Sequence, residues 1–300
     1  MSAHPADVPP SPTPNTWSVL IRYPRFVELH RLLTQCQQLT QAVGEPQCMS
    51  LEGQAGVGKS TWVQDYLRRF PRRQTRAGLQ VPVLSLMVPA PATIKSITAA
   101  MLAALGDPAA HKGTQWSMAQ RLVKFLPACK VQLVVLDDFH HLIDRERNRV
   151  LESVADWLKV LIKQTGTPFL VVGMEGTVEQ ILRPNAQLSR LFAVRETLRP
   201  FAWPQQQAEF AKFVGYVERS LARPLTAALP REDLLQRLYL ATDGVVGNVL
   251  NLWRYALWHA EDHATLELAD LAWAYQTRLA RHVGRSANPF LDAQKKSPPR

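Results

Sequence analysis

A glycine-rich segment has the residue types and spacing of a phosphate-binding loop. Residues Gly53-Gln54-Ala55-Gly56-Val57-Gly58-Lys59-Ser60 match GxxxxGK[ST] at every fixed position, after a strand pattern and at the start of a helix pattern. Glycines let the backbone approach a ligand closely, so that its N–H groups and the helix N-terminus can point at phosphates. Lys59 is expected to reach the β and γ phosphates, and the Ser60 hydroxyl to hold Mg²⁺. The segment predicts a site for ATP and Mg²⁺, with Thr61 as a further nucleotide-binding residue. The alternative is a chance glycine-rich turn.

Two acidic residues follow an apolar run over residues 131–136. A carboxylate at the carboxyl end of a buried strand, beside a phosphate-binding loop, is placed to hold the water shell of Mg²⁺. Asp137 is predicted in that role, and Asp138 as the base that orients the attacking water. The alternative for the pair is a polar cap on the strand. Together the two motifs favour a nucleotide hydrolase more strongly than either does alone.

Both motifs lie where strand and helix patterns alternate, which predicts an α/β fold with a parallel sheet. Strands are expected near 47–51, 81–88, 131–136, 168–172 and 194–198, and helices near 24–43, 59–70, 93–105, 116–126, 148–163 and 177–192, the fourth ending before Pro127. After Pro200 the strand patterns stop. Helical stretches near 204–222, 231–241, 247–261 and 266–283 predict a small all-helical lid, whose core we expect to contain Trp253, Trp258, Trp273 and Tyr255 rather than to offer them for base stacking.

Composition and chain organisation restrict the possible classes. The chain has 300 residues, of which 46% are hydrophobic and 20% charged, which excludes a chain disordered throughout. We expect a proline-rich disordered arm at 1–20, an ATPase domain at 21–200, a lid at 201–284 and a basic polar tail at 285–300. No apolar stretch is long enough to span a membrane, and no signal peptide is evident. Three cysteines without a CxxC pair indicate neither a disulfide framework nor a zinc site, so we expect a cytoplasmic protein.

The charge balance points to a polyanionic partner. Lys and Arg number 35 against 25 Asp and Glu, a formal net charge of +10. Such a balance favours nucleic acid or an anionic membrane surface, without choosing between them. Five arginines follow the helix after the phosphate-binding loop: Arg68, Arg69, Arg72, Arg73 and Arg76. We take Arg72 and Arg73 as candidate DNA contacts; a protein-binding patch and a solvated helix end are the alternatives.

Several segments together resemble one family, the TniB/TnsC group of AAA+ ATPases, which regulate DDE-type transposases. The resemblance runs from about residue 20 to 282. Besides the two motifs, it rests on Phe169-Leu170-Val171-Val172-Gly173-Met174-Glu175, Gln187-Leu188-Ser189-Arg190-Leu191-Phe192 and Thr242-Asp243-Gly244-Val245-Val246-Gly247. It implies a five-stranded parallel sheet with a helical lid, ATP bound between the subunits of a ring or helical filament, and sequence-independent binding of double-stranded DNA. It also implies a DDE transposase and a TniQ-like adaptor as partners, and no membrane.

The family pattern also implies roles for single residues, and this chain departs from it in three places. The family usually has Glu where Asp138 stands. Asp is one methylene shorter, which predicts slow hydrolysis, or hydrolysis that needs a partner to tighten the site. The arginine that reaches a neighbouring subunit's γ-phosphate is expected at Arg190, because Leu191 occupies its usual place. Arg183 and Arg195 are the alternatives for this role, and a solvated or salt-bridged arginine is the alternative for Arg190 itself. Asn248 stands where many lids carry an arginine. Glu175 falls at the polar sensor position, where a simple turn residue is the alternative.

The segment around Lys112 and Thr114, together with Lys95, resembles the inner DNA-contacting loops of the family. Lys and Thr can reach backbone phosphates without reading sequence. An ordinary basic loop is the alternative. Other functions remain open for the whole chain: an AAA+ motor or secretion-associated ATPase without a DNA role, a STAND-like nucleotide switch, or an IstB-like helper of the same broad class.

Overall fold

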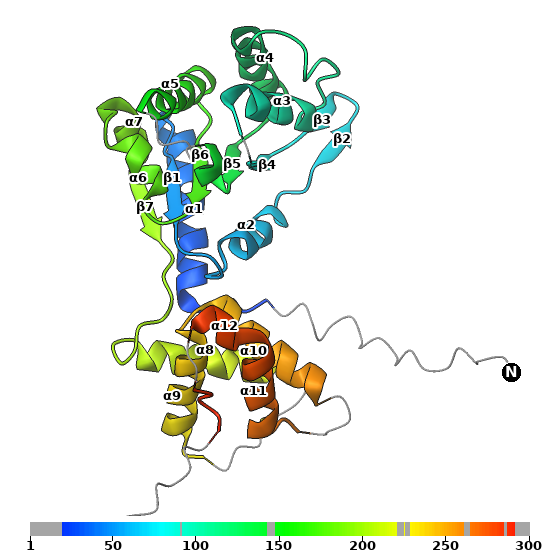
Figure 1. Ribbon diagram of the computed structural model, residues 1–300. Coiled ribbons are helices and arrows are strands. Elements are labelled where there is room, and N and C mark those ends of the chain that lie inside the picture. The colour runs from blue at the N-terminus through cyan, green and yellow to red at the C-terminus, as the bar shows by residue number, and fades with distance from the viewer. Residues whose placement is uncertain are drawn as a thin grey trace, which may run out of the picture. The chain divides into compact units, whose positions relative to one another are not determined.

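The computed structural model describes residues 20–90, 92–142, 148–220, 225, 229–260, 265–284 and 287–291 (Figure 1). The chain divides into two compact units: residues 24–199 form one, and the residues from Pro200 onward form the other together with those before Pro24. Most of the expected arm and tail therefore lies outside the described residues. No helix among these residues is long and apolar enough to cross a membrane.

The unit formed by residues 24–199 is built on a parallel five-stranded sheet, as predicted. Its strands are β1 (Met49–Glu52), β4 (Val83–Met87), β5 (Leu133–Asp137), β6 (Phe169–Gly173) and β7 (Val194–Thr197), in the order β4-β5-β6-β1-β7. Every residue of β5 and β6 is buried, which explains why both strands are uninterrupted apolar runs in the sequence.

One helix precedes the first of these strands, and the others lie between the strands along the chain. The helices are α1 (Pro24–Val43), α2 (Lys59–Leu67), α3 (Ile94–Ala104), α4 (Gln115–Ala128), α5 (Asn148–Thr165), α6 (Thr177–Leu182) and α7 (Ala186–Leu191), with a 3-10 turn η1 at Phe139–Leu142. The expectation that α4 ends before Pro127 is wrong, because the helix continues to Ala128. Pro127 stands in the last turn, where Lys130 N–H donates to its carbonyl at 3.0 Å and Cys129 N–H donates to Phe125 O at 2.9 Å. A proline at that place removes one N–H without stopping the turn from closing.

The segment that carries the arginine run forms a hairpin that the sequence patterns did not indicate. Strands β2 (Arg73–Thr75) and β3 (Gly78–Gln80) pair antiparallel, with Thr75 opposite Gly78. Gly78 has φ +119°, a conformation that favours glycine. The hairpin gives Arg73 and Arg76 exposed positions beyond the end of α2.

The other unit is helical, as predicted for the lid. It contains α8 (Gln207–Ser220), α9 (Arg231–Thr242), α10 (Val246–His259), α11 (Leu268–Ala274), a π-helical turn η2 (Tyr275–Leu279) and α12 (Ala280–Val283). The last expected helix is present as one continuous helical run from Leu268 to Val283, which contains the π-helical turn η2. Trp253 is buried, but Trp258 is 45% exposed and does not belong to the core. Trp253 and Trp258 are five residues apart on α10. At 3.6 residues per turn, their side chains therefore project from different faces of the helix.

Candidate nucleotide-binding site

The glycine-rich loop connects the end of β1 to the start of α2, as the motif requires. A Cβ at Gly53 would lie 2.3 Å from the Leu198 carbonyl oxygen, so only glycine fits there. Gly56 and Gly58 have φ of +80° and +98°, angles that side chains rarely permit. These glycines therefore serve close approach and backbone shape, the two properties a phosphate cradle needs.

Lys59 is the first residue of α2, and its side chain contacts this loop. The residue is 8% exposed, and its ammonium donates hydrogen bonds to Gly53 O at 2.6 Å and Gln54 O at 2.9 Å. Burial lowers the pKa of Lys59, while the nearby Asp137 and Asp138 carboxylates raise it. A phosphate anion would be a stronger partner for this desolvated cation than two neutral carbonyl groups.

Asp137, the last residue of β5, is brought to Ser60, the other expected Mg²⁺ ligand. Burial raises the pKa of the Asp137 carboxyl, and the hydrogen bond with Ser60 and the one from Asp138 N–H lower it. The second of these bonds joins Asp138 N to Asp137 Oδ1 at 2.9 Å. A hydroxyl and a carboxylate are the hard oxygen donors that Mg²⁺ prefers, so the residues present fit this ion.

Asp138 occupies an unusual backbone position at the same edge of the sheet. Its φ is +54°, in the left-handed region that Asp tolerates better than most residues. The turn is closed by His141 N–H, which donates to Asp138 O at 3.1 Å. The side chain is partly exposed and is thus open to a water molecule.

Glu175 follows β6, the strand that lies between β5 and β1 in the sheet. Its carboxylate forms an exposed ion pair. Its Oε1 accepts hydrogen bonds from Arg199 Nε at 3.2 Å and from a terminal nitrogen of Arg199 at 3.1 Å. The expected sensor residue therefore has an arginine partner in its own unit. Of the two groups, Arg199 is the more exposed.

The structure separates Arg190 from the loop of its own chain. The helix that carries it, α7, ends at Leu191, whose carbonyl accepts a hydrogen bond of 2.8 Å from Cys48 N. Cys48 precedes β1, whereas Gly53 follows it. The five extended residues from Cys48 to Gly53 span roughly 16 Å, so the end of α7 and the start of the loop lie at opposite ends of this strand. Arg190 and Arg183 are both exposed. Arg195, the other alternative, has its guanidinium bound within its own unit, as described below.

The structure separates two of the candidate DNA contacts, Arg72 and Lys95. Arg72 donates to Ala104 O at 2.6 Å, at the last residue of α3, whereas Lys95 lies in the first turn of that 11-residue helix. Helical rise puts those ends about 16 Å apart. Lys112 and Thr114 precede α4, and the Thr114 hydroxyl caps that helix by accepting from Ser117 N at 3.2 Å. Arg72, Arg73, Lys95, Lys112 and Thr114 are all exposed.

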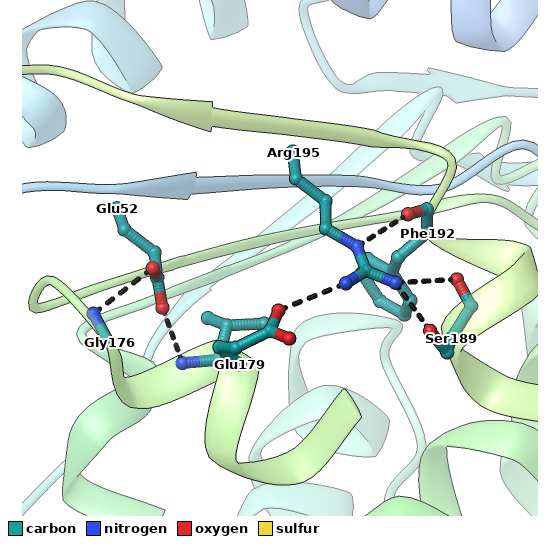
Figure 2. A network of polar contacts seen from close by, with 7 residues as sticks. Glu52, Gly176, Glu179, Ser189, Phe192 and Arg195 are labelled. Carbon is teal, nitrogen blue, oxygen red and sulfur yellow. Dashed lines mark hydrogen bonds and ion pairs between the residues drawn. The ribbon is translucent and has the colours of Figure 1, made fainter. Parts of the chain in front are cut away.

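Sequence reasoning missed the polar contacts that join β1, α6 and α7 (Figure 2). The Glu52 carboxylate accepts hydrogen bonds from Gly176 N at 3.1 Å and from Val178 N at 2.5 Å. One signal was available: an acidic residue at the end of a buried strand, next to Gly53, needs a partner. No local pattern marks Arg195, whose partners are distributed over two helices.

Comparisons with known proteins identify the family and the fold of the chain. The family model described as "Bacterial TniB protein" matches residues 16–201, more than half of the chain. No curated protein matches the sequence. Among solved structures, Orc1 of Aeropyrum pernix, determined in complex with DNA, is 19% identical with a TM-score of 0.59, over 88% of this chain and 67% of that one.

Two further solved structures share this fold. Orc2 of Aeropyrum pernix, in ADPNP–ADP complexes, is 16% identical with a TM-score of 0.60, over 86% of this chain and 68% of that one. Cdc6p from Pyrobaculum aerophilum is 14% identical with a TM-score of 0.61, over 88% of this chain and 69% of that one. At such identities these similarities establish the fold, which is that of the AAA+ class. From the family match, the chain belongs to the TniB family of bacterial proteins, and it is an AAA+ ATPase.

Proposed function

We propose that this protein is an ATP-dependent regulator of DNA transposition, which assembles on duplex DNA with ATP and activates a DDE transposase. The observation that carries the ATP-dependent part is the convergence of Lys59, Ser60 and Asp137 at one edge of the sheet. Membership of the TniB family supports the part played in transposition.

At the nucleotide site, each residue of this chain has a distinct task. Lys59 and the loop N–H groups bind the β and γ phosphates, and Ser60 and Asp137 hold Mg²⁺, which neutralises charge on the phosphates. Asp138 accepts a hydrogen bond from the attacking water and orients it. Because Asp is shorter than Glu, the water is held less well, and hydrolysis is slow enough to act as a timer that resets the assembly.

Arg190 is proposed to complete the site of a neighbouring copy. Leu191 contacts the start of β1, and Gly53 follows its end. This separation supports the proposal that Arg190 acts on the nucleotide of another subunit rather than on that of its own. An arginine supplied by a neighbour stabilises charge that develops on the transferred phosphoryl group. Such a contact makes ATP the link between copies in a ring or a helical filament.

DNA is proposed to bind through phosphate contacts that do not read sequence. The formal net charge of +10 and the exposed Lys95, Lys112 and Thr114 support this proposal. Arg72 and Arg73 lie beyond the other end of α3 and form a second candidate surface. A TniQ-like adaptor is the further partner that we propose beside the transposase.

A switch without a DNA role is the second candidate. The observation that favours it is Asp138, whose length suits a nucleotide held for long times rather than rapid turnover. This alternative predicts that ATP is retained stoichiometrically and that DNA leaves the ATPase rate unchanged.

Electron microscopy of the purified protein with duplex DNA tests the proposal. We expect rings or filaments on DNA with a slowly hydrolysed ATP analogue, and none with ADP. Lys59→Ala is the matched control, which should bind no nucleotide and form no assembly with either. Single particles off DNA in both nucleotides, together with an ATPase rate that DNA does not change, would contradict the proposal and favour the switch.

A further inference from the structure

Arg195 on the edge strand β7 is the centre of a polar network that includes the end of α7 (Figure 2). Its Nε donates to Phe192 O at 3.0 Å. One terminal nitrogen donates to Ser189 O at 3.0 Å and to Ser189 Oγ at 2.5 Å, and the other to Glu179 Oε2 at 2.9 Å. A single planar guanidinium thus binds α7, the residue after it, and α6.

These contacts matter because α7 is short. A helix of six residues has little stability of its own. Its last carbonyl groups have no partners within the helix, and Arg195 supplies donors to Ser189 O and Phe192 O. A cation at a helix carboxyl end is also favoured by the helix dipole. The geometry of this end, where Arg190 directly follows Ser189, therefore depends on Arg195.

The same network is connected to the nucleotide loop. Glu52, next to Gly53, holds the start of α6 by accepting hydrogen bonds from Gly176 N and Val178 N. Glu179, the next residue of α6, binds Arg195. Both ends of this chain of contacts are fixed to strands of one sheet, β1 and β7, which pair directly with Ser50 opposite Arg195.

We infer that Arg195 is a positioning residue: it holds the carboxyl end of α7 so that Arg190 is presented to the nucleotide of a neighbouring copy. This inference rests on the role of Arg190 proposed above. It predicts that loss of Arg195 harms the next copy's site and leaves the nucleotide site of its own copy intact. A role in general stability alone predicts no such distinction between copies.

Mixed assemblies distinguish the two. Asp138→Asn serves as the donor, because it should bind ATP without hydrolysing it and retains Arg190 and Arg195. Arg195→Ala alone is expected to bind ATP normally and to hydrolyse it roughly 10- to 100-fold more slowly, the size of loss that a misplaced group causes. Mixed equally with the donor on DNA, it should recover to about a quarter of the wild-type rate, since half of the copies have an intact site and half of those meet an intact neighbour.

Arg190→Ala mixed with the same donor is the reference pair, and each protein alone gives the baseline. Recovery in both mixtures supports the inference. Recovery with Arg190→Ala but not with Arg195→Ala overturns it and leaves the role of Arg190 standing. Recovery in neither shows that Arg190 does not act between copies, and the inference falls with it.

Two milder variants keep the test valid if Arg195→Ala folds poorly. Glu179→Gln retains the shape and loses the charge, and Arg195→Lys retains a cation but not the planar fork. Each should lose part of the activity and be restored by the donor; a loss that the donor does not restore counts against the inference. Arg231→Ala removes a two-pronged pair with Glu218, at 2.6 and 2.9 Å in the helical unit, and should retain full activity unmixed.

Discussion

At the residue scale, the length of one side chain is expected to set the rate of hydrolysis. Asp138 stands in a left-handed turn after β5, partly exposed at the edge where the loop begins. Asp138→Glu extends the carboxylate by one methylene and should raise the steady-state ATPase rate several-fold. Asp138→Asn should lower it by about 100-fold or more, the contribution of a positioned base, while nucleotide binding measured by filter retention stays unchanged. Unaltered turnover in Asp138→Asn would assign the base elsewhere.

The neighbouring carboxylate predicts a pH dependence. Burial raises the pKa of Asp137, and Mg²⁺ requires the ionised form, so protons compete with the metal. As the pH falls from 8 toward 5, the apparent Mg²⁺ affinity of the nucleotide complex should therefore decrease. This decrease should begin at a higher pH than it would if the carboxylate had an ordinary pKa. Titration calorimetry checks this. Asp137→Asn should bind Mg²⁺ weakly at every pH; an equally steep pH dependence in that variant would exclude Asp137 as its source.

At the element scale, the join between β1 and the loop should tolerate no side chain at all. Gly53→Ala places a methyl group against the backbone of Leu198, which cannot rotate away, so we expect a loss of about 2 kcal/mol in the free energy of unfolding and weaker nucleotide binding. Gly215→Ala, inside α8, meets only the end of the Arg219 side chain. That control should gain roughly 0.5–1 kcal/mol through helix propensity. Thermal unfolding with and without nucleotide compares them; equal effects would contradict the prediction.

The elements could be predicted wherever one physical signal dominated. Buried strands such as β5 and β6 show as continuous apolar runs, and the loop motif fixes its own strand and helix. The β2–β3 hairpin was missed because three-residue strands with exposed or half-buried side chains have no hydrophobic period to detect. The prediction that α4 ends before Pro127 was wrong because a proline is tolerated in the last turn of this helix, although it would disrupt the middle of one.

The candidate site divides in the same way. Lys59, Ser60 and Asp137 could be found because their spacing is itself the signal, and the fold brings them to one edge. Arg195 was a candidate only for a different role, and its partners on α6 and α7 could not be predicted, because only the fold brings them together. The separation of Arg72 from Lys95 likewise depends on the path of α3, which charge patterns along the sequence do not reveal.

At the scale of the whole molecule, the excess of positive charge predicts how the proposed DNA binding should respond to salt. Contacts to phosphates release counterions, so the logarithm of affinity should fall linearly with the logarithm of salt concentration, equally for unrelated duplex sequences. Lys112→Ala should reduce that slope by about 1. Lys163→Ala, an exposed lysine near the end of α5, is the matched control and should leave it unchanged. Fluorescence anisotropy at several salt concentrations measures both; a strong sequence preference would contradict phosphate binding.

The opposite placement of Gly53 and Arg190 along β1 gives each molecule a direction. If one end receives an arginine and the other end delivers one, every contact between copies is head to tail. In a closed ring, every nucleotide then receives an arginine from a neighbouring copy. An open filament always ends in one copy whose ATP receives no such arginine. That copy would keep its nucleotide longest, so the two tips of a filament would differ chemically, and loss of subunits would favour one tip over the other.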